Sequence, residues 1–165
     1  ETLVVHLLAG RERGRHVENP RQVAAYRYPE RYGPKSPSFA RGTVTSYGVL
    51  LVSGTASIVG HESAFPGNPA RQTEETLHNI EALLDAASVP GRHGALGGRL
   101  RSLRVYVRRP EQLEAIRAAI VARAGSSVPT AWLQGQICRE ELLVEIEATA
   151  LLDPGLRGEG LTRKD

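Results

Sequence analysis

Methionine is absent from this chain of 165 residues, and cysteine occurs only once, as Cys138. A single cysteine excludes an internal disulfide and is typical of a reducing compartment, so we predict a cytoplasmic protein. No apolar run approaches the ~20 residues that a membrane-spanning helix needs, and no secretory signal sequence is visible. We therefore predict no association with a membrane.

Excess charge of either sign is also small. The 21 Lys and Arg residues against 18 Asp and Glu residues leave a net charge of +3. So small a surplus forms no basic stripe, and we predict no nucleic-acid partner. The five histidines are scattered without HxH or HExxH spacing, so the sequence gives no support for a metal site.

The remaining pattern predicts one α+β domain. Apolar and β-branched residues predict strands over 2–8, on both sides of Tyr47–Gly48, over 98–109, and over 131–137 and 142–151 as a closing hairpin. Asn68 and Pro69 begin a helix that stops before Pro90, and a second helix begins at Pro110 and ends at Gly125. A single mixed sheet with both helices packed on one face is the economical arrangement, and it leaves the other face for water, a partner or a pocket.

Two carboxylates stand out on the last strand, in LLVEIEATA. Strand alternation assigns one set of side chains to the helix-covered face and puts Glu145 and Glu147 on the other, roughly 7 Å apart. The two acids either belong to a solvated surface or, if buried, have raised pKa values suited to a general acid. The helix-facing set is Leu142, Val144, Ile146, Ala148 and Ala150, and the opposite set is Leu143, Glu145, Glu147 and Thr149.

Aromatic residues are few, yet three of the five tyrosines lie in one run, YRYPERYGPKSPSFARG, at 26–42. The same run carries three arginines, a lysine and three prolines, so it predicts a loop with no long regular element. Guanidinium groups are suited to binding an anion. We interpret the run as either an ordinary surface loop or the wall of a pocket for an anion.

Several motifs resemble those of known proteins. LLVSGTASIVG, ARQTEETLHNIEALLDAA, LRVYVRRPEQLEAIRA and LLVEIEATA, spread over 40–150, are similar to the RidA (YjgF) superfamily. VENPRQVAAYRYPERYGPKSPSFARG, SGTASIVGHES and LQGQICREELLVEIEA resemble the C-terminal half of the chorismatases within it. The resemblance implies a RidA-like, chorismate mutase-like sheet and a cofactor-independent enzyme that splits chorismate into pyruvate and a ring acid, either 3-hydroxybenzoate or a dihydroxycyclohexadiene carboxylate.

The resemblance also implies the organisation of the protein. Chorismatases are about twice as long, with a second RidA-like half in front, so we interpret 1–153 as a RidA-like chorismatase domain that lacks its N-terminal half. Residues 154–165 are expected to form a polar tail. RidA proteins complete their sites at subunit interfaces, so the partner is expected to be either the missing half or two further copies in a homotrimer.

The resemblance assigns roles residue by residue. Glu145 matches the acid/base carboxylate of the superfamily, and Glu147 is expected to be structural or to act on the pKa of Glu145. A residue near Cys138 helps select the ring product in chorismatases, so Cys138 is expected to line the pocket as an inert group. Arg31 is, like Arg27, an alternative to Arg41 for binding a carboxylate, and Lys35 is expected to lie at the surface. The predicted substrate-binding residues are Arg41, Arg27, Tyr26, Tyr28, Tyr32, Gly54, Thr55 and Cys138.

Two other functions remain open at this point. The imine deaminases of the RidA branch hold their substrate carboxylate with an arginine whose matching position here is Thr130, and no arginine occurs within 126–136. This departure disfavours a 2-iminoacid deaminase. A non-catalytic RidA-like partner module is the third reading, and the ribonuclease activity ascribed to some relatives is weaker for want of basic residues.

Overall fold

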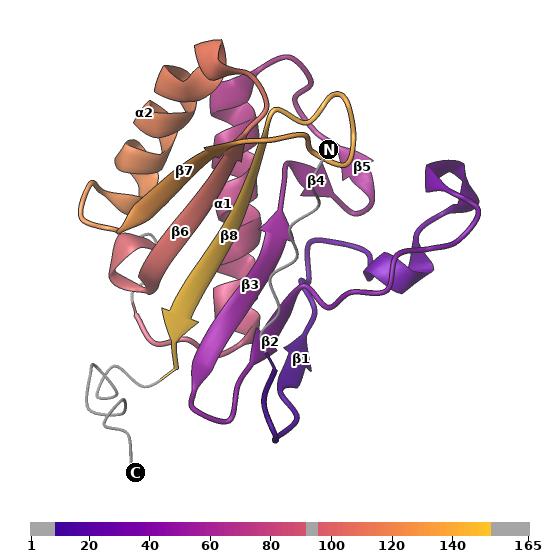
Figure 1. Cartoon of the computed structure of the whole chain (residues 1–165), viewed down its shortest axis with the longest axis vertical. Coiled ribbons are helices and arrows are strands. Elements are labelled where there is room, and N and C mark those ends of the chain that lie inside the picture. Colours follow the sequence, from indigo (N-terminus) through magenta and orange to yellow (C-terminus); the bar gives the residue numbers. More distant parts are fainter. Residues whose placement is uncertain (1–8, 92–95, 153–165) are drawn as a thin grey trace.

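The computed structural model describes residues 9–91 and 96–152. A six-stranded mixed sheet has the order β1-β2-β3-β8-β6-β7, and a separate pair is formed by β4 and β5. Figure 1 shows both long helices behind this sheet. The strands are β1 (Arg15–Val17), β2 (Gly42–Val44), β3 (Val49–Thr55), β4 (Ile58–Val59), β5 (Glu62–Ser63), β6 (Leu100–Val107), β7 (Thr130–Gln134) and β8 (Val144–Leu151).

The two helices begin where the sequence predicted. In α1 (Pro69–Ala86), the Asn68 side chain accepts a hydrogen bond of 3.0 Å from the N–H of Arg71, and Pro69 occupies the first turn. The second begins with a 3₁₀ turn, η4 (Pro110–Gln112), and continues as α2 (Leu113–Ala124). Gly125 ends it at φ 79°, a conformation that favours glycine. The remaining 3₁₀ turns are η1 (Ala25–Arg27), η2 (Glu30–Tyr32) and η3 (Leu96–Gly98).

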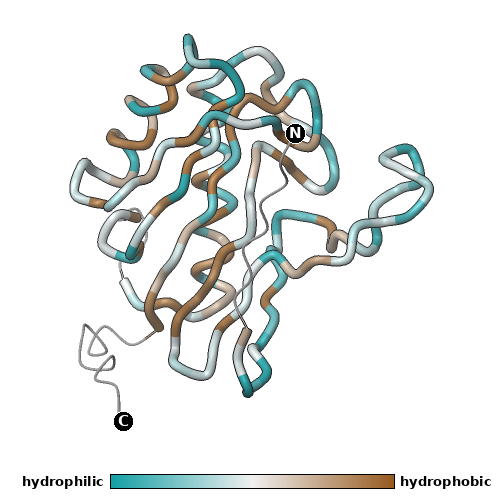
Figure 2. Tube along the Cα trace, viewed as in Figure 1, coloured by the Kyte–Doolittle hydropathy of each residue, from teal (hydrophilic) through white to brown (hydrophobic). Residues whose placement is uncertain are grey.

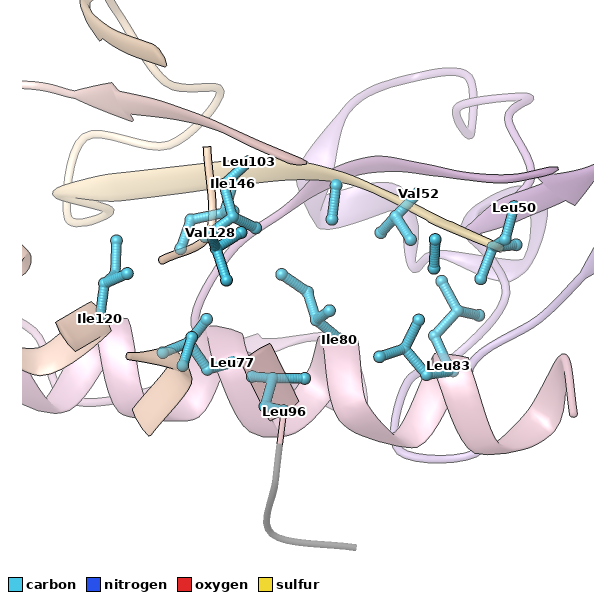
Figure 3. Close-up of a cluster of buried hydrophobic side chains, with 14 of the residues drawn as sticks. Leu50, Val52, Leu77, Ile80, Leu83, Leu96, Leu103, Ile120, Val128 and Ile146 are labelled. Carbon is cyan, nitrogen blue, oxygen red and sulfur yellow. The ribbon is translucent and has the colours of Figure 1, made fainter. Parts of the chain in front are cut away.

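The core lies between the sheet and the helices. Figure 3 shows Leu77, Ile80 and Leu83 of α1 pointing towards Leu50, Val52 and Ile146 of the sheet. In β8 buried residues alternate strictly with half-buried ones, which confirms the predicted two-faced strand from residue 144 onward. Leu142 departs from this prediction because it precedes the strand, and it packs instead in a small second cluster with Ala56, Ile58 and Ile137.

The predicted hairpin around Tyr47–Gly48 is confirmed by the antiparallel pairing of β2 with β3. The predicted closing hairpin is wrong. β7 pairs in parallel with β6, and β8 is inserted between β3 and β6, so β7 and β8 are not neighbours. Sequence alternation identifies strands but not which strand a buried strand pairs with, and here α2 provides the crossover that a parallel pair requires. The strand predicted over 2–8 lies outside the described residues.

Candidate active site

The uncovered face of the sheet contains a hollow of about 440 Å³, a volume suited to a small organic ligand. Its walls come from β3, from the start of β8, from the preceding loop and from the segment 24–40, which projects from the body in Figure 1. Figure 2 shows that this segment is mostly hydrophilic. The lining residues are Tyr28, Tyr32, Pro37, Phe39, Arg41, Ser53, Gly54, Ala56, Ile58, Cys138, Arg139 and Glu145.

Glu145 is the acid of this cavity. It is half-buried on the uncovered face of β8. Burial, and then the neighbouring charge of Glu147, raise the pKa of its carboxyl group above the ordinary value. Glu147 itself is held by Arg104, whose Nη1 donates to it at 2.7 Å, and by the hydroxyl of Tyr106 at 3.3 Å. The two carboxylates of β8 therefore differ, since Glu147 is ion-paired and Glu145 faces the cavity.

Gly54 makes room for the Glu145 carboxylate. A Cβ atom at this glycine would lie 2.3 Å from Oε1 of Glu145, well inside van der Waals contact. The position also belongs to an irregularity of β3, because the register with β8 shifts between Val52 and Thr55. Gly54 therefore lies at an irregularity of the strand and allows a close approach to its backbone, and the group that approaches is the Glu145 carboxylate.

Arg41 provides a buried positive charge at the same cavity. Only 4% of its surface is exposed. Its Nη2 donates to the carbonyl of Val23 at 3.0 Å and to the hydroxyl of Tyr28 at 2.7 Å, while Nε has no hydrogen-bond partner. The guanidinium also lies 5.1 Å from the ring centre of Phe39. Arg41 is thus fixed in place at the wall of the cavity, with a buried Nε that has no hydrogen-bond partner.

A second guanidinium, that of Arg139, contacts the ring of Tyr28, which Arg41 also contacts. It lies 4.0 Å from the ring centre of Tyr32 and 5.6 Å from that of Tyr28, and its Nη1 donates to the Ser63 hydroxyl at 3.0 Å. The two tyrosine rings are 5.6 Å apart. Sequence reasoning missed Arg139 because the motif CREE suggested pairing with adjacent acids, whereas its aromatic contacts come from a segment far away in the chain.

Cys138 lines the cavity beside Arg139 and is exposed to solvent. The protein packed around its sulfur and the charge of Glu145 raise the pKa of the thiol. A thiol with a raised pKa is a weak nucleophile at neutral pH. This geometry fits a residue that shapes the pocket without attacking the ligand.

Three predicted ligand-binding residues do not line the cavity. Tyr26 is 57% exposed and contacts Arg27, which also stays outside. Thr55 follows the irregularity of β3, which turns its side chain to the buried side, where the hydroxyl donates to the carbonyl of Ser53 at 2.8 Å. The alternative candidate Arg31 also stays outside and instead forms an ion pair of 2.8 Å with Glu62 of β5. Lys35 is exposed, as expected.

A second hollow of about 670 Å³ lies on the same face of the sheet, over β6, β7 and β8. Thr130 lines it together with Arg104, Ser102, Glu147 and Thr149. Within 9–91 and 96–152, no three His, Cys, Asp or Glu side chains are grouped so that they could hold a metal ion. Neither helix of these ranges is long and apolar enough to cross a membrane.

Comparison with solved structures defines the class of fold. The chain superimposes on RidA from the Antarctic bacterium Psychrobacter sp. with a TM-score of 0.58 and 17% identity, covering 83% of this chain and 98% of that one. For the YjgF gene product of E. coli the TM-score is 0.62 at 16% identity, over the same shares. At such identities the likeness shows the fold alone, and the predicted RidA-like sheet is confirmed.

A narrower similarity follows from sequence. The chain is 40% identical to a 3-hydroxybenzoate synthase of Streptomyces hygroscopicus over 161 residues, which are 90% of this chain and 47% of that protein. It is 41% identical to a chorismatase of Streptomyces rapamycinicus over 80% of this chain and 42% of that one. A chorismatase crystal structure matches with a TM-score of 0.75 and 37% identity, over 86% of this chain and 44% of the other.

The chain is therefore a chorismatase-like sequence with a RidA-type fold, and it spans about half the length of the curated relatives it matches. No protein-family model matches it.

Proposed function

We propose that this chain forms the catalytic part of an enzyme that cleaves the enolpyruvyl ether of chorismate, releasing pyruvate and a ring acid. The observation that carries the proposal is a single acid, Glu145, with a raised pKa in a cavity that also holds Arg41 and Arg139. The sequence similarity to a 3-hydroxybenzoate synthase and to chorismatases points to the same chemistry.

The first step of the reaction has a residue to perform it. An enolpyruvyl ether is broken once its methylene carbon is protonated, and protonation of carbon needs a positioned acid that is still protonated near neutral pH. Glu145 supplies that proton from Oε1 or Oε2. The resulting oxocarbenium ion is captured by water or by the hydroxyl of the ring, and loss of pyruvate leaves the hydroxylated ring acid.

The two guanidinium groups suit a substrate with two carboxylates. Arg41 is rigid and buried with an unpaired Nε, and Arg139 is packed on aromatic rings. Each can bind a carboxylate through a charge-assisted hydrogen bond, and Tyr28 and Tyr32 contribute ring surface to the same pocket. The deaminase alternative receives no such support, because Thr130 replaces the clamp arginine and lies in the other hollow.

The partner is also part of the proposal. We infer that a second RidA-like unit, either another half of the same protein or further copies of this chain, covers the free face of the sheet. The half-length match to the relatives and the large hollow over β6, β7 and β8 support this arrangement. A cytoplasmic location stays a prediction from the cysteine content.

The test is to replace Glu145 by Gln in the protein and to measure release of pyruvate from chorismate with a coupled lactate dehydrogenase assay. Gln keeps the shape but cannot deliver the proton, so kcat should fall by about 100-fold or more. Glu114→Gln on the exposed side of α2 is the matched control and should keep full activity. Undiminished pyruvate release by Glu145→Gln would exclude the proposed acid.

A further inference from the structure

Arg108 lies at the end of β6, on the uncovered face and outside the wall of the cavity. Its backbone N–H donates to the carbonyl of Leu143 at 3.0 Å, which places its side chain close to the segment that enters β8. The proposed reaction does not use this residue directly. Its contacts nevertheless concentrate on one part of the site.

Four hydrogen bonds join the Arg108 side chain to the segment 136–142. Nε donates to the carbonyl of Leu142 at 2.6 Å, and Nη2 donates to the carbonyls of Ile137 and Arg139, both at 2.7 Å. Nη1 donates to the side-chain oxygen of Gln136 at 2.6 Å. A guanidinium has five N–H donors in a planar fork, so most of the donors of Arg108 bond to this segment.

Within the described part of the chain, the segment 136–142 lacks strand partners that could donate hydrogen bonds to its carbonyl groups. It runs from β7 to β8, which are not paired with each other, so its carbonyl groups have no partner strand. It carries two cavity residues, Cys138 and Arg139, and it leads within a few residues to Glu145. Apart from Arg108, its contacts include the burial of Ile137 and Leu142 in a small apolar cluster and hydrogen bonds to Gln72 and Ser63. Arg139 also packs on the rings of Tyr32 and Tyr28.

We infer that Arg108 is a positioning residue that fixes Cys138 and Arg139 relative to Glu145 and thereby sets substrate affinity. The catalytic consequence rests on the proposed function. The positioning itself does not, because it follows from bonds between Arg108 and the backbone. A displaced loop would move one anion-binding group and one pocket-lining thiol at once.

The first measurement uses chorismate with the variants Arg108→Met and Arg108→Lys and the control Arg109→Met. Met removes all four bonds, while Lys keeps the charge but cannot span the carbonyl groups. We expect kcat/KM to fall about 100-fold for Arg108→Met and less for Arg108→Lys, mainly through KM. Arg109 is the next residue in the chain, is exposed, and makes no side-chain hydrogen bond to cap η4. Arg109→Met should therefore keep the wild-type kcat and KM.

The second measurement is independent of the reaction. Cys138 is the one cysteine of the sequence and reports the position of the segment through its rate of alkylation by iodoacetamide, assigned by peptide mass. Release of the segment removes the protein packed around the sulfur and separates it from Glu145, so alkylation should become several times faster in both Arg108 variants and stay unchanged in Arg109→Met.

Thermal unfolding of each variant identifies those that fold. If Arg108→Met does not fold, the alkylation rate of Arg108→Lys tests the inference. Unchanged alkylation in a folded variant would overturn the inference. Absence of pyruvate from the wild-type protein, both alone and with a second RidA-like half supplied, would refute the proposed function instead. The alkylation rates would still decide whether Arg108 holds the segment in place.

Discussion

At the scale of single residues, the site depends on how two glutamates of one strand are treated differently. Both project from the uncovered face of β8, yet Glu147 has a guanidinium and a phenol as partners, whereas Glu145 faces a cavity beside the backbone of Gly54. Burial raises the pKa of Glu145, and the charge of Glu147 raises it further. Glu147 thus helps to keep its neighbour protonated without touching the cavity.

This relation predicts a pH effect of Glu147→Gln. A general acid works while it is protonated, so activity is lost as the pH rises through the pKa of Glu145. Removing the negative charge of Glu147 lowers that pKa, and the alkaline limb of kcat/KM should therefore move to lower pH. Pyruvate release measured across the neutral range checks this, with Glu114→Gln as the control. A limb that moves to higher pH, or stays in place, contradicts the role of Glu147.

At the scale of elements, the contact between β3 and β8 builds the floor of the site. The register irregularity between Val52 and Thr55 brings the backbone of Gly54 against the Glu145 carboxylate and turns Thr55 away from the cavity. On the other side, Asn79 of α1 donates to the carbonyls of Ala56 and Ile58 at 3.1 and 2.9 Å. The helix therefore holds the chain that follows the irregularity, although it lies behind the sheet.

Gly54→Ala tests this contact. The new methyl group would clash with the end of a flexible side chain, so Glu145 should move while the fold is kept. We expect kcat to fall about 10-fold to 100-fold with little change in the thermal unfolding midpoint. Gly98→Ala, where a Cβ would meet nothing within 4 Å, is the matched control. Full activity of Gly54→Ala would show that the close approach has no catalytic importance.

At the scale of the whole molecule, the main feature is a sheet covered on one face only. Figure 1 shows α1 and α2 on the same side of the sheet. The residues of the other side line both hollows. The half-buried Leu51 lines the larger hollow in the middle of this free face. A partner unit of the same fold would cover that surface and close the adjacent cavity.

The mass of the chain in solution tests this arrangement. We expect light scattering to give a multiple of 17.9 kDa, or a single chain that releases pyruvate only when a second RidA-like half is supplied. Leu51→Glu places a charge on the free face of the sheet, which the partner would cover, and should abolish either association. Exposed Val121 on α2, changed to Glu, is the control. A monomer that cleaves chorismate without a partner would exclude the proposed second unit.

Much of this could be predicted from sequence because the signals are local. The Asn68–Pro69 start of α1, the end of α2 at Gly125 and the two faces of β8 follow from capping, backbone conformation and alternation. Arg41 was predicted as a pocket residue from its place in the tyrosine-rich run and does line the cavity with Glu145. The roles of both in catalysis remain predictions.

What local signals do not contain is the pairing of distant segments. The insertion of β8 between β3 and β6, the packing of Arg139 on Tyr32 and the four bonds of Arg108 each join parts of the chain that are far apart. The amino-acid sequence by itself determined the elements, the two-faced last strand and the chemical types at the site. Only the tertiary structure decided which strands are neighbours and which arginines face the acid, because those contacts depend on long-range packing and not on the period of any one segment.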